Sequence, residues 1–219
     1  MNYAQIREFD IANGVGIRTT IFVTGCTHNC PGCFNKAYMN FNYGKLWTNE
    51  TTQKVIKYLS NENVSGLTIL GGEPFQNEVD LYDVLLEIKK FIDKNIWIYS
   101  GYTYEEIVMD ENKKKLMELC DVLVDGKFIL SKKNLRLKFR GSSNQRIIDM
   151  VSSFQRMEFA QSGKDFAAQE IFPGREKIVE HGVGHAFAHS AKPHVSAKLF
   201  RRNVRQESAH TYFSSPETD

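Results

Sequence analysis

Residues 17–35 read IRTTIFVTGCTHNCPGCFN and join an apolar, β-rich run to a loop that holds three of the chain's four cysteines. The run at 17–25 is rich in β-branched residues and ends at a glycine, which is typical of a strand followed by a turn. Cys26, Cys30 and Cys33 then follow with the spacing C-x3-C-x2-C. The stretch therefore predicts a strand whose end carries three thiols in one short loop.

Short apolar runs alternate with longer stretches of helical period from this strand to about residue 140. We expect further strands at 67–70, 96–101, 122–127 and 135–141, and helices at 51–59, at 77–93 and ending near residue 119. Thr48 or Asn49 should cap the first of these helices. Leu81, Leu85 and Ile88 recur at three- and four-residue steps and form one apolar helix face. This alternation predicts an α/β fold with a mainly parallel sheet.

The composition places limits on the compartment and the partners. The chain has 219 residues, of which 25% are charged, and a formal net charge of +2. That charge is too balanced to indicate a nucleic-acid or membrane-surface protein. No apolar window is long enough to span a membrane, and the N-terminus is acidic where a signal peptide would be basic. We expect a cytoplasmic protein with no nucleic-acid or membrane partner, whose clustered cysteines bind a metal or perform redox chemistry.

Four interpretations of the cysteine loop compete. A disulfide would leave an odd thiol, and buried apolar thiols would not need a polar loop that contains glycine and proline. A structural zinc site needs four ligands, and His28, which lies between two of the cysteines, is geometrically awkward as the fourth. An iron–sulfur cluster takes thiolate ligands, and three cysteines would leave one iron of a [4Fe-4S] cluster open to a substrate or cofactor. The residues favour a [4Fe-4S] cluster on Cys26, Cys30 and Cys33.

The cysteine spacing after the first strand resembles the cluster signature of the radical S-adenosylmethionine (SAM) enzymes. The sequence GGEP at 71–74 follows the second expected strand, so its loop should share one rim with the cysteine loop. Adjacent glycines would let the backbone approach a bound ligand closely. The resemblance implies an incomplete (βα) barrel of the radical SAM type, with SAM on the open iron and cofactor contacts from Gly32, Cys33, Phe34, Gly71, Gly72 and Glu73. Taken alone, GGEP is equally consistent with a turn, and Glu73 with a helix cap.

Further blocks narrow the resemblance. The sequences at 10–36, 71–77, 96–107, 121–128 and 140–146 are similar to those of anaerobic ribonucleoside-triphosphate reductase activating proteins, which typically carry glycine before the third cysteine and an aromatic-Asn pair after it. Gly32, Phe34 and Asn35 match that pattern here. The resemblance implies that reduced flavodoxin or a similar donor supplies an electron, that SAM is cleaved, and that the resulting 5′-deoxyadenosyl radical takes hydrogen from a glycine of the reductase large subunit.

Two alternatives to this function stay open. In the first alternative, the chain acts on another glycyl radical enzyme such as pyruvate formate-lyase. Activators of that enzyme, however, carry an aromatic residue before the third cysteine. The other alternative is a non-catalytic zinc or iron–sulfur module. Cys120 begins an apolar strand, where a packed thiol is expected, and Asp125 and Gly126 end a strand on the same rim, where a turn explains them as well as a site role does.

The residue usage changes near residue 150. Five of the six histidines but a single leucine lie in the last 69 residues, and no strand-helix alternation continues there. We expect residues 1–150 to form the radical SAM activase domain, and residues 151–219 to be a disordered or irregular, loosely helical tail outside the family pattern. His181, His185 and His189 are four residues apart, but nearby glycines and a proline disfavour a helical metal site.

Overall fold

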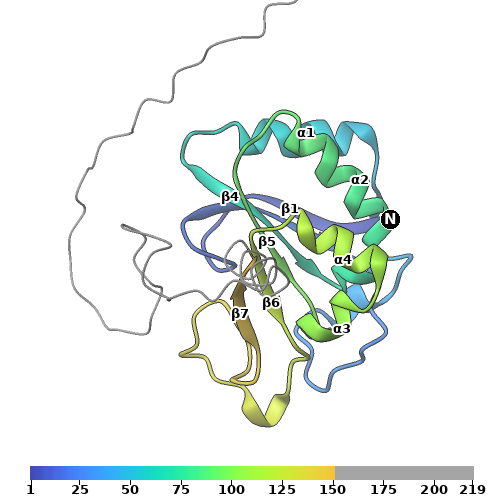
Figure 1. The fold of residues 1–219 in the computed structure, drawn as a ribbon, viewed down its shortest axis with the longest axis vertical. Coiled ribbons are helices and arrows are strands. Elements are labelled where there is room, and N and C mark those ends of the chain that lie inside the picture. The colour runs from blue at the N-terminus through green and yellow to red at the C-terminus, as the bar shows by residue number, and fades with distance from the viewer. Residues whose placement is uncertain (151–219) are drawn as a thin grey trace, which may run out of the picture. The chain divides into compact units, whose positions relative to one another are not determined.

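The computed structural model describes residues 1–150, which form one seven-stranded sheet with the order β3-β1-β2-β4-β5-β6-β7 (Figure 1). The strands are β1 (Asn2–Asp10), β2 (Ile17–Val23), β3 (Lys45–Leu46), β4 (Val64–Gly71), β5 (Asn95–Tyr99), β6 (Val122–Asp125) and β7 (Arg146–Asp149). The α-helices are α1 (Asn49–Leu59), α2 (Glu78–Lys89), α3 (Tyr104–Val108) and α4 (Glu111–Glu118), and the 3₁₀ helices are η1 (Lys36–Met39), η2 (Pro74–Gln76) and η3 (Leu130–Lys132).

The centre of the sheet is parallel and its edges are antiparallel. Strands β2, β4, β5 and β6 pair in parallel, whereas β1, β3 and β7 each pair antiparallel with their neighbours. Parallel neighbours need crossover connections, and helices α1, α2 and the α3–α4 pair provide them. The carboxyl ends of the four central strands therefore meet at one edge, where the cysteine loop, the GGEP loop and the loops after β5 and β6 all begin.

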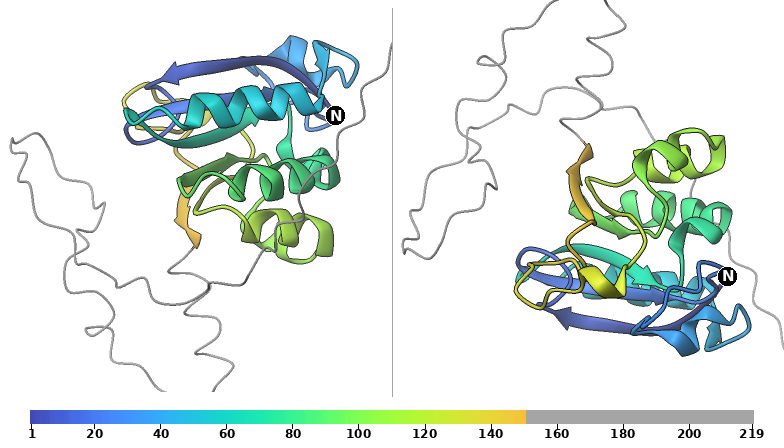
Figure 2. Two further views of the ribbon diagram at one scale, coloured as in Figure 1. Left: turned by 90° about the horizontal axis from the view of Figure 1, so that it is seen from above. Right: turned by 90° about the horizontal axis from the view of Figure 1, so that it is seen from below.

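The hydrophobic core lies between one face of this sheet and helices α1, α2 and α4 (Figure 2). Its sheet side is formed by Ile21, Val23, Leu67, Ile69, Ile96 and Ile98, and its helix side by Val55, Leu59, Leu81, Leu85, Ile88 and Leu116. Helix α1 begins as the sequence predicts, because the Thr48 hydroxyl accepts a hydrogen bond from the Thr51 N–H. The apolar stripe expected on residues 77–93 is the face that α2 buries.

The opposite face of the sheet is more polar and is covered by the segment between β6 and β7. Buried Arg18 donates from Nε to the Thr68 hydroxyl (2.6 Å) and lies over the Trp97 ring. Burial lowers the pKa of Arg18 to about 10. Phe139 contacts Trp97 edge-on, and its carbonyl oxygen accepts from the Tyr99 hydroxyl (2.9 Å). This face therefore tolerates a buried cation because hydroxyl and carbonyl oxygens satisfy it.

The structure confirms the α/β class and the four parallel strands, but it corrects three details of the sequence prediction. Residues 135–141 are not a strand: they lie in turns, and Leu135 is 86% exposed. The last strand is β7 instead, which pairs with β6. Strands β1 and β3 were not predicted, and the helix expected to end near residue 119 consists of α3 and α4. Alternating polarity at 135–141 is a local property, whereas strand formation also requires a partner with free backbone groups.

Two remaining predictions concern membranes and the C-terminal segment. No helix within residues 1–150 has the length and apolar character that crossing a membrane requires. Met150 is buried, and its N–H donates to the Asp121 carbonyl oxygen (2.9 Å). The expected tail at 151–219 and its histidines lie outside the described residues.

Candidate metal centre

The cysteine loop begins where β2 ends and is held by the short helix that follows it. The N–H groups of Gly25 and Cys26 donate to the carbonyl oxygens of Tyr38 (2.8 Å) and Met39 (3.0 Å) in η1. Asn29 and Gly32 have positive φ angles of 49° and 74°, which turn the chain sharply between the cysteines. The loop thus brings Cys26, Cys30 and Cys33 together as free, partly exposed thiols.

The electrostatics of these thiols suit a cationic ligand. Burial raises the pKa of Cys26, and the negative charges of Glu73, Cys30 and Cys33 raise it further. Burial and the Cys33 charge likewise raise the pKa of Cys30, while a hydrogen bond from the Phe128 N–H and the charge of Lys127 oppose them. Three thiolates gathered in one partly buried loop repel one another, and bound iron would remove that repulsion. The donor set therefore fits an iron–sulfur cluster.

The side chain of His28, the candidate fourth ligand for a zinc ion, is held by Glu73. Within residues 1–150, no three His, Cys, Asp or Glu side chains converge on one ion-sized point. The His28 ring is nearly buried, its Nε2 donates to Glu73 Oε2 (3.0 Å), and it packs edge-on against Tyr102. In a [4Fe-4S] cluster each cysteine binds a different iron, so the thiols need not converge on one point.

The GGEP loop lies directly beside the base of the cysteine loop, as the shared rim predicts. The Gly72 N–H donates to the Val23 carbonyl oxygen (2.8 Å), and the Glu73 N–H donates to the Gly25 carbonyl oxygen (2.7 Å). A Cβ at Gly71 would lie 2.4 Å from the Val23 carbonyl oxygen, and one at Gly72 would lie 2.4 Å from that of Gly25. These glycines therefore permit a close approach between two protein backbones, in addition to any approach to a ligand.

The segment after β6 borders the cysteine loop through residues that the sequence prediction did not single out, beyond the Asp125 and Gly126 that end the strand. Phe128 contacts the Phe34 ring at 5.4 Å between centroids, and Lys133 Nζ lies 4.9 Å from the same ring. A Cβ at Gly32 would lie 2.9 Å from Leu130 Cδ1. The only sequence signal for this segment was the block at 121–128, whose loop residues have no motif of their own.

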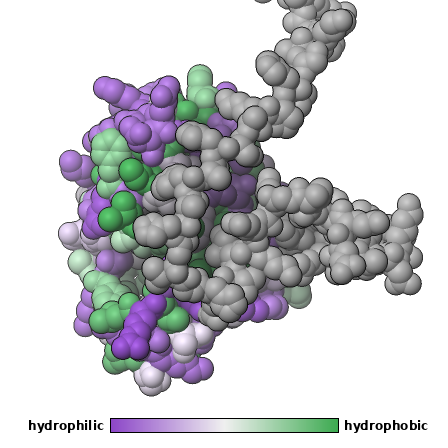
Figure 3. Space-filling view, turned by 90° about the vertical axis from the view of Figure 1, so that its left-hand side faces the viewer, coloured by the Kyte–Doolittle hydropathy of each residue, from purple (hydrophilic) through white to green (hydrophobic). Residues whose placement is uncertain are grey.

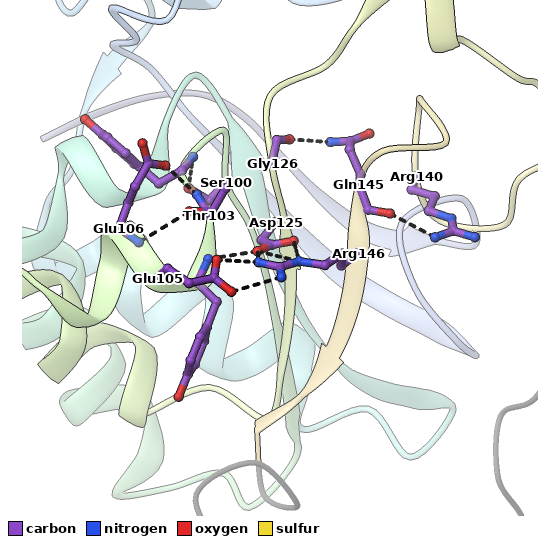
Figure 4. Close-up of polar contacts among 11 residues, drawn as sticks. Ser100, Thr103, Glu105, Glu106, Asp125, Gly126, Arg140, Gln145 and Arg146 are labelled. Carbon is purple, nitrogen blue, oxygen red and sulfur yellow. Dashed lines mark hydrogen bonds and ion pairs between the residues drawn. The ribbon is translucent and has the colours of Figure 1, made fainter. Parts of the chain in front are cut away.

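A hollow of about 480 Å³ opens beside these loops at the ends of β5 and β6. It is lined by Gly101, Thr103, Glu105, Glu106, Asp125, Gly126, Lys127, Ile129, Asn144 and Arg146. Arg146 lies between two carboxylates (Figure 4): its Nε donates to Asp125 Oδ1 (3.0 Å), and its Nη1 donates to Glu105 Oε1 (3.0 Å). The hydrogen bonds that Arg146 donates to Glu105 lower the pKa of Glu105 to about 2. The hollow thus has one mainly polar wall of paired charges.

Comparison of the sequence with those of known proteins places the chain in a family. A profile of the family described as "4Fe-4S single cluster domain" matches residues 12–148. The anaerobic ribonucleoside-triphosphate reductase-activating protein of Enterobacteria phage T4 is 38% identical over 152 residues, which are 67% of this chain and 93% of the relative. The proteins of the same name from Vibrio cholerae (39% over 153 residues) and Escherichia coli K12 (38% over 150 residues) are matched over 97% and 96% of their lengths.

The chain belongs to the anaerobic ribonucleoside-triphosphate reductase-activating protein family. The family profile spans the cysteine loop, the GGEP loop and the hollow. Nearly the whole length of these family members is matched by only two thirds of this chain. Residues 151–219 lie beyond the profile, which ends at residue 148, and the family resemblance read from the sequence likewise extends to about residue 148.

Proposed function

We propose that this chain is an activating enzyme that generates a glycyl radical on the large subunit of an anaerobic ribonucleoside-triphosphate reductase. The observation that carries the proposal is the three-thiol loop, which lies beside the GGEP loop in a chain whose relatives bear the name of reductase-activating proteins. Cys26, Cys30 and Cys33 would hold a [4Fe-4S] cluster with one open iron for SAM. When bound, this pair of cofactors would supply reductive cleavage of SAM to methionine and a 5′-deoxyadenosyl radical.

In this scheme the protein's own residues bind and orient SAM and shield the cluster from water. The hollow at the ends of β5 and β6 has the volume of a small-ligand site, and we assign it to the part of SAM that extends beyond the cluster. Phe34 and Phe128 pack together next to Gly32 and Cys33, where their rings would exclude water from the cluster. The contacts to SAM remain predictions, and the residues concerned are Gly32, Cys33, Phe34, Gly71, Gly72 and Glu73.

We propose that the open sheet is an incomplete radical SAM barrel. Its edge strands β3 and β7 do not pair with each other among the described residues, so the sheet does not close. A macromolecular substrate would cover the open side, which a small-molecule enzyme would have to close itself. We also propose a cytoplasmic location, since thiolate ligands must stay reduced.

We propose an acidic electron-transfer protein such as flavodoxin as the donor. Residues 126–148 contain seven basic residues and no acidic one. Five of the basic residues, Lys127, Lys132, Lys133, Arg136 and Lys138, are exposed and have no carboxylate partner in the described part of the chain. This segment is the yellow loop at the bottom of Figure 1, and at the bottom of Figure 3 the described surface mixes hydrophilic and hydrophobic side chains. It borders the cluster loop through Phe34, so a donor held there would be close to the cluster.

The donor assignment is tested by charge reversal. Replacing Lys132, Lys133 and Arg136 by glutamate should slow cluster reduction by flavodoxin and weaken its salt dependence, whereas reduction by dithionite should not change. Lys57→Glu on α1 is the matched control. An unchanged rate with flavodoxin would rule out this surface as the docking site.

The activase function is tested by anaerobic reconstitution with iron and sulfide. The reconstituted protein should release 5′-deoxyadenosine from SAM in the presence of dithionite, and should produce a glycyl radical signal on the reductase large subunit in electron paramagnetic resonance (EPR). Pyruvate formate-lyase is the control substrate and should give no signal. Protein that contains stoichiometric zinc and no iron, or a radical on pyruvate formate-lyase alone, would contradict the proposal.

A further inference from the structure

We propose that Glu73 and Gln76 of the GGEPFQ segment form a clamp that fixes the chain between Cys26 and Cys30, with Glu73 acting through His28. We call Glu73, Gln76, Thr27 and His28 the loop clamp. The inference rests on the proposed cluster, and it assigns to Glu73 the role of a positioning residue.

The Glu73 carboxylate accepts hydrogen bonds from four donors of the protein. Oε1 accepts from the Phe75 N–H (3.0 Å) and the Ser100 hydroxyl (2.9 Å). Oε2 accepts from the Gly101 N–H (2.7 Å) and from His28 Nε2 (3.0 Å). A carboxylate offers about four lone-pair positions, and Glu73 is only 1% exposed. These four donors therefore hold the carboxylate in one orientation, with Oε2 facing His28.

Gln76 holds the residue next to His28 from the same segment. Gln76 Oε1 accepts from the Thr27 N–H (2.9 Å), and Gln76 Nε2 donates to the Thr27 hydroxyl (2.7 Å). The same amide nitrogen also donates to the Tyr102 hydroxyl (2.9 Å). Both residues that directly follow Cys26 are therefore tied to the end of β4 by side chains.

The end of β5 completes the seat for the His28 ring. Tyr102 packs edge-on against that ring at 4.5 Å between centroids, and a Cβ at Gly101 would lie 2.4 Å from His28 Cδ2. The ring thus fills a space that any side chain at Gly101 would occupy. The loop clamp joins the ends of β2, β4 and β5 through side chains, with the contacts of Glu73 more deeply buried than those of Gln76.

The position of the clamp suggests what it does. Thr27 and His28 lie between two cluster ligands, so fixing them sets the separation of the Cys26 and Cys30 thiolates before iron binds. Residues that orient metal ligands in this way typically change metal affinity by about 10- to 100-fold when they are replaced. A loose loop would still contain the cysteines, but it would hold the cluster less tightly and less uniformly.

The test compares His28→Leu, His28→Gln, Glu73→Gln and the double variant His28→Leu/Glu73→Gln in the reconstituted full-length protein. The readouts are the rate of iron loss to a chelator and the EPR spectrum of the dithionite-reduced cluster, both without SAM. We expect His28→Leu and Glu73→Gln each to lose iron about tenfold faster with a broadened spectrum. His28→Gln keeps an amide donor for Glu73 and should remain near wild type. The double variant should be no worse than either single variant, because both remove one interaction.

Two outcomes would refute the clamp. If Glu73→Gln raises the Kd for SAM while its cluster spectrum and iron retention stay at wild-type values, Glu73 contacts the cofactor and the clamp is refuted. Wild-type iron retention in His28→Leu would also overturn it. Should Glu73→Gln fail to fold, the His28→Leu and His28→Gln pair decides alone. A wild-type protein that binds the cluster but does not cleave SAM would contradict the proposed function, while the chelator rates would still judge the clamp.

Discussion

Cys120 differs from the other three cysteines in burial, and this difference separates a packing thiol from candidate ligands. Its side chain is 4% exposed in the core, its Sγ donates to the Leu116 carbonyl oxygen (3.5 Å), and burial raises the pKa of the thiol strongly. Cys26, Cys30 and Cys33 lie on the rim and are partly exposed. A buried thiol of raised pKa is inert toward metal, whereas a partly exposed one is available.

We predict that alanine at Cys26, Cys30 or Cys33 will each abolish the oxygen-sensitive cluster and SAM cleavage. Cys120→Ala should keep both and should lower the free energy of unfolding by about 1 kcal/mol, because it leaves a small cavity. Iron content, 5′-deoxyadenosine yield and urea denaturation measure these effects. A requirement for Cys120 in cluster assembly would show that the ligand set is wrong.

Gly72→Ala should disturb the cysteine loop as well as the GGEP loop. The new methyl group would lie 2.4 Å from the Gly25 carbonyl oxygen and 2.8 Å from that of Tyr38, which are backbone atoms that cannot move independently. We expect iron content after reconstitution to fall together with SAM affinity. Gly126→Ala is an informative comparison, since its Cβ would have no neighbour closer than 3.8 Å, although Gly126, unlike Gly72, has a positive φ. A Gly72→Ala protein with full iron content and weakened SAM binding would instead place the cofactor against this glycine.

At the scale of elements, the antiparallel pair β6 and β7 shapes the hollow. Arg146 begins β7 opposite Asp125 at the end of β6, and it also reaches Glu105 in α3. Asp125 is 1% exposed, so it depends on this partner, whereas Glu105 is exposed. One arginine thus ties the last strand to both the preceding strand and the helix between β5 and β6.

Arg146→Met should destabilise the apo protein by about 2 kcal/mol, because it leaves the buried Asp125 carboxylate without its cationic partner. Glu105→Gln removes only an exposed ion pair and should cost a fraction of that. Urea denaturation of the two variants beside the wild type provides the comparison. Equal losses would mean that Asp125 finds another donor when Arg146 is absent.

The Glu105–Arg146 contact also predicts a pH dependence. The folded state lowers the pKa of Glu105 from 4.5 to about 2, so its contribution to stability is present above about pH 4.5. That contribution is lost as the pH falls from about 4.5 toward about 2. The stability of Glu105→Gln should therefore decrease less than that of the wild type between about pH 6 and about pH 3. Parallel decreases in the two proteins would show that the carboxylate is not held by Arg146 in solution.

At the scale of the whole molecule, the family match and the described core end at nearly the same place. The family profile stops at residue 148, and Met150 packs in the core behind β7. Family members matched over 93–97% of their lengths account for only two thirds of this chain. The residues that we assign to the cluster, the loop clamp and the hollow all precede residue 150.

Removal of residues 151–219 should therefore preserve the cluster, SAM cleavage and activation of the reductase. Comparing the truncated and full-length proteins requires iron content, 5′-deoxyadenosine yield and the glycyl radical signal. We expect all three to agree within error. A truncated protein that keeps its cluster but no longer forms the radical on the reductase would identify residues 151–219 as a partner-binding element.

Local sequence patterns determined much of this protein. The apolar runs of β2, β4, β5 and β6, the Thr48 cap, the stripe of α2 and the cysteine spacing are all properties of neighbouring residues, so they could be read without coordinates. The juxtaposition of the cysteine and GGEP loops followed as well, because loops after parallel strands share one rim.

Other features depended on which distant segments pack together. Residues 135–141 alternate in polarity like a strand, yet the strand that hydrogen-bonds to β6 in the folded sheet is β7. The sequence offered Glu73 as a cofactor contact or a helix cap. In the structure its side chain caps η2 by accepting from the Phe75 N–H, and only folding brings His28 and the end of β5 to the same carboxylate. Phe128 borders the cysteine loop only because folding brings its ring against that of Phe34. Local periodicity encodes which face of an element is apolar, but the partner of a buried polar group is decided only when the chain is folded.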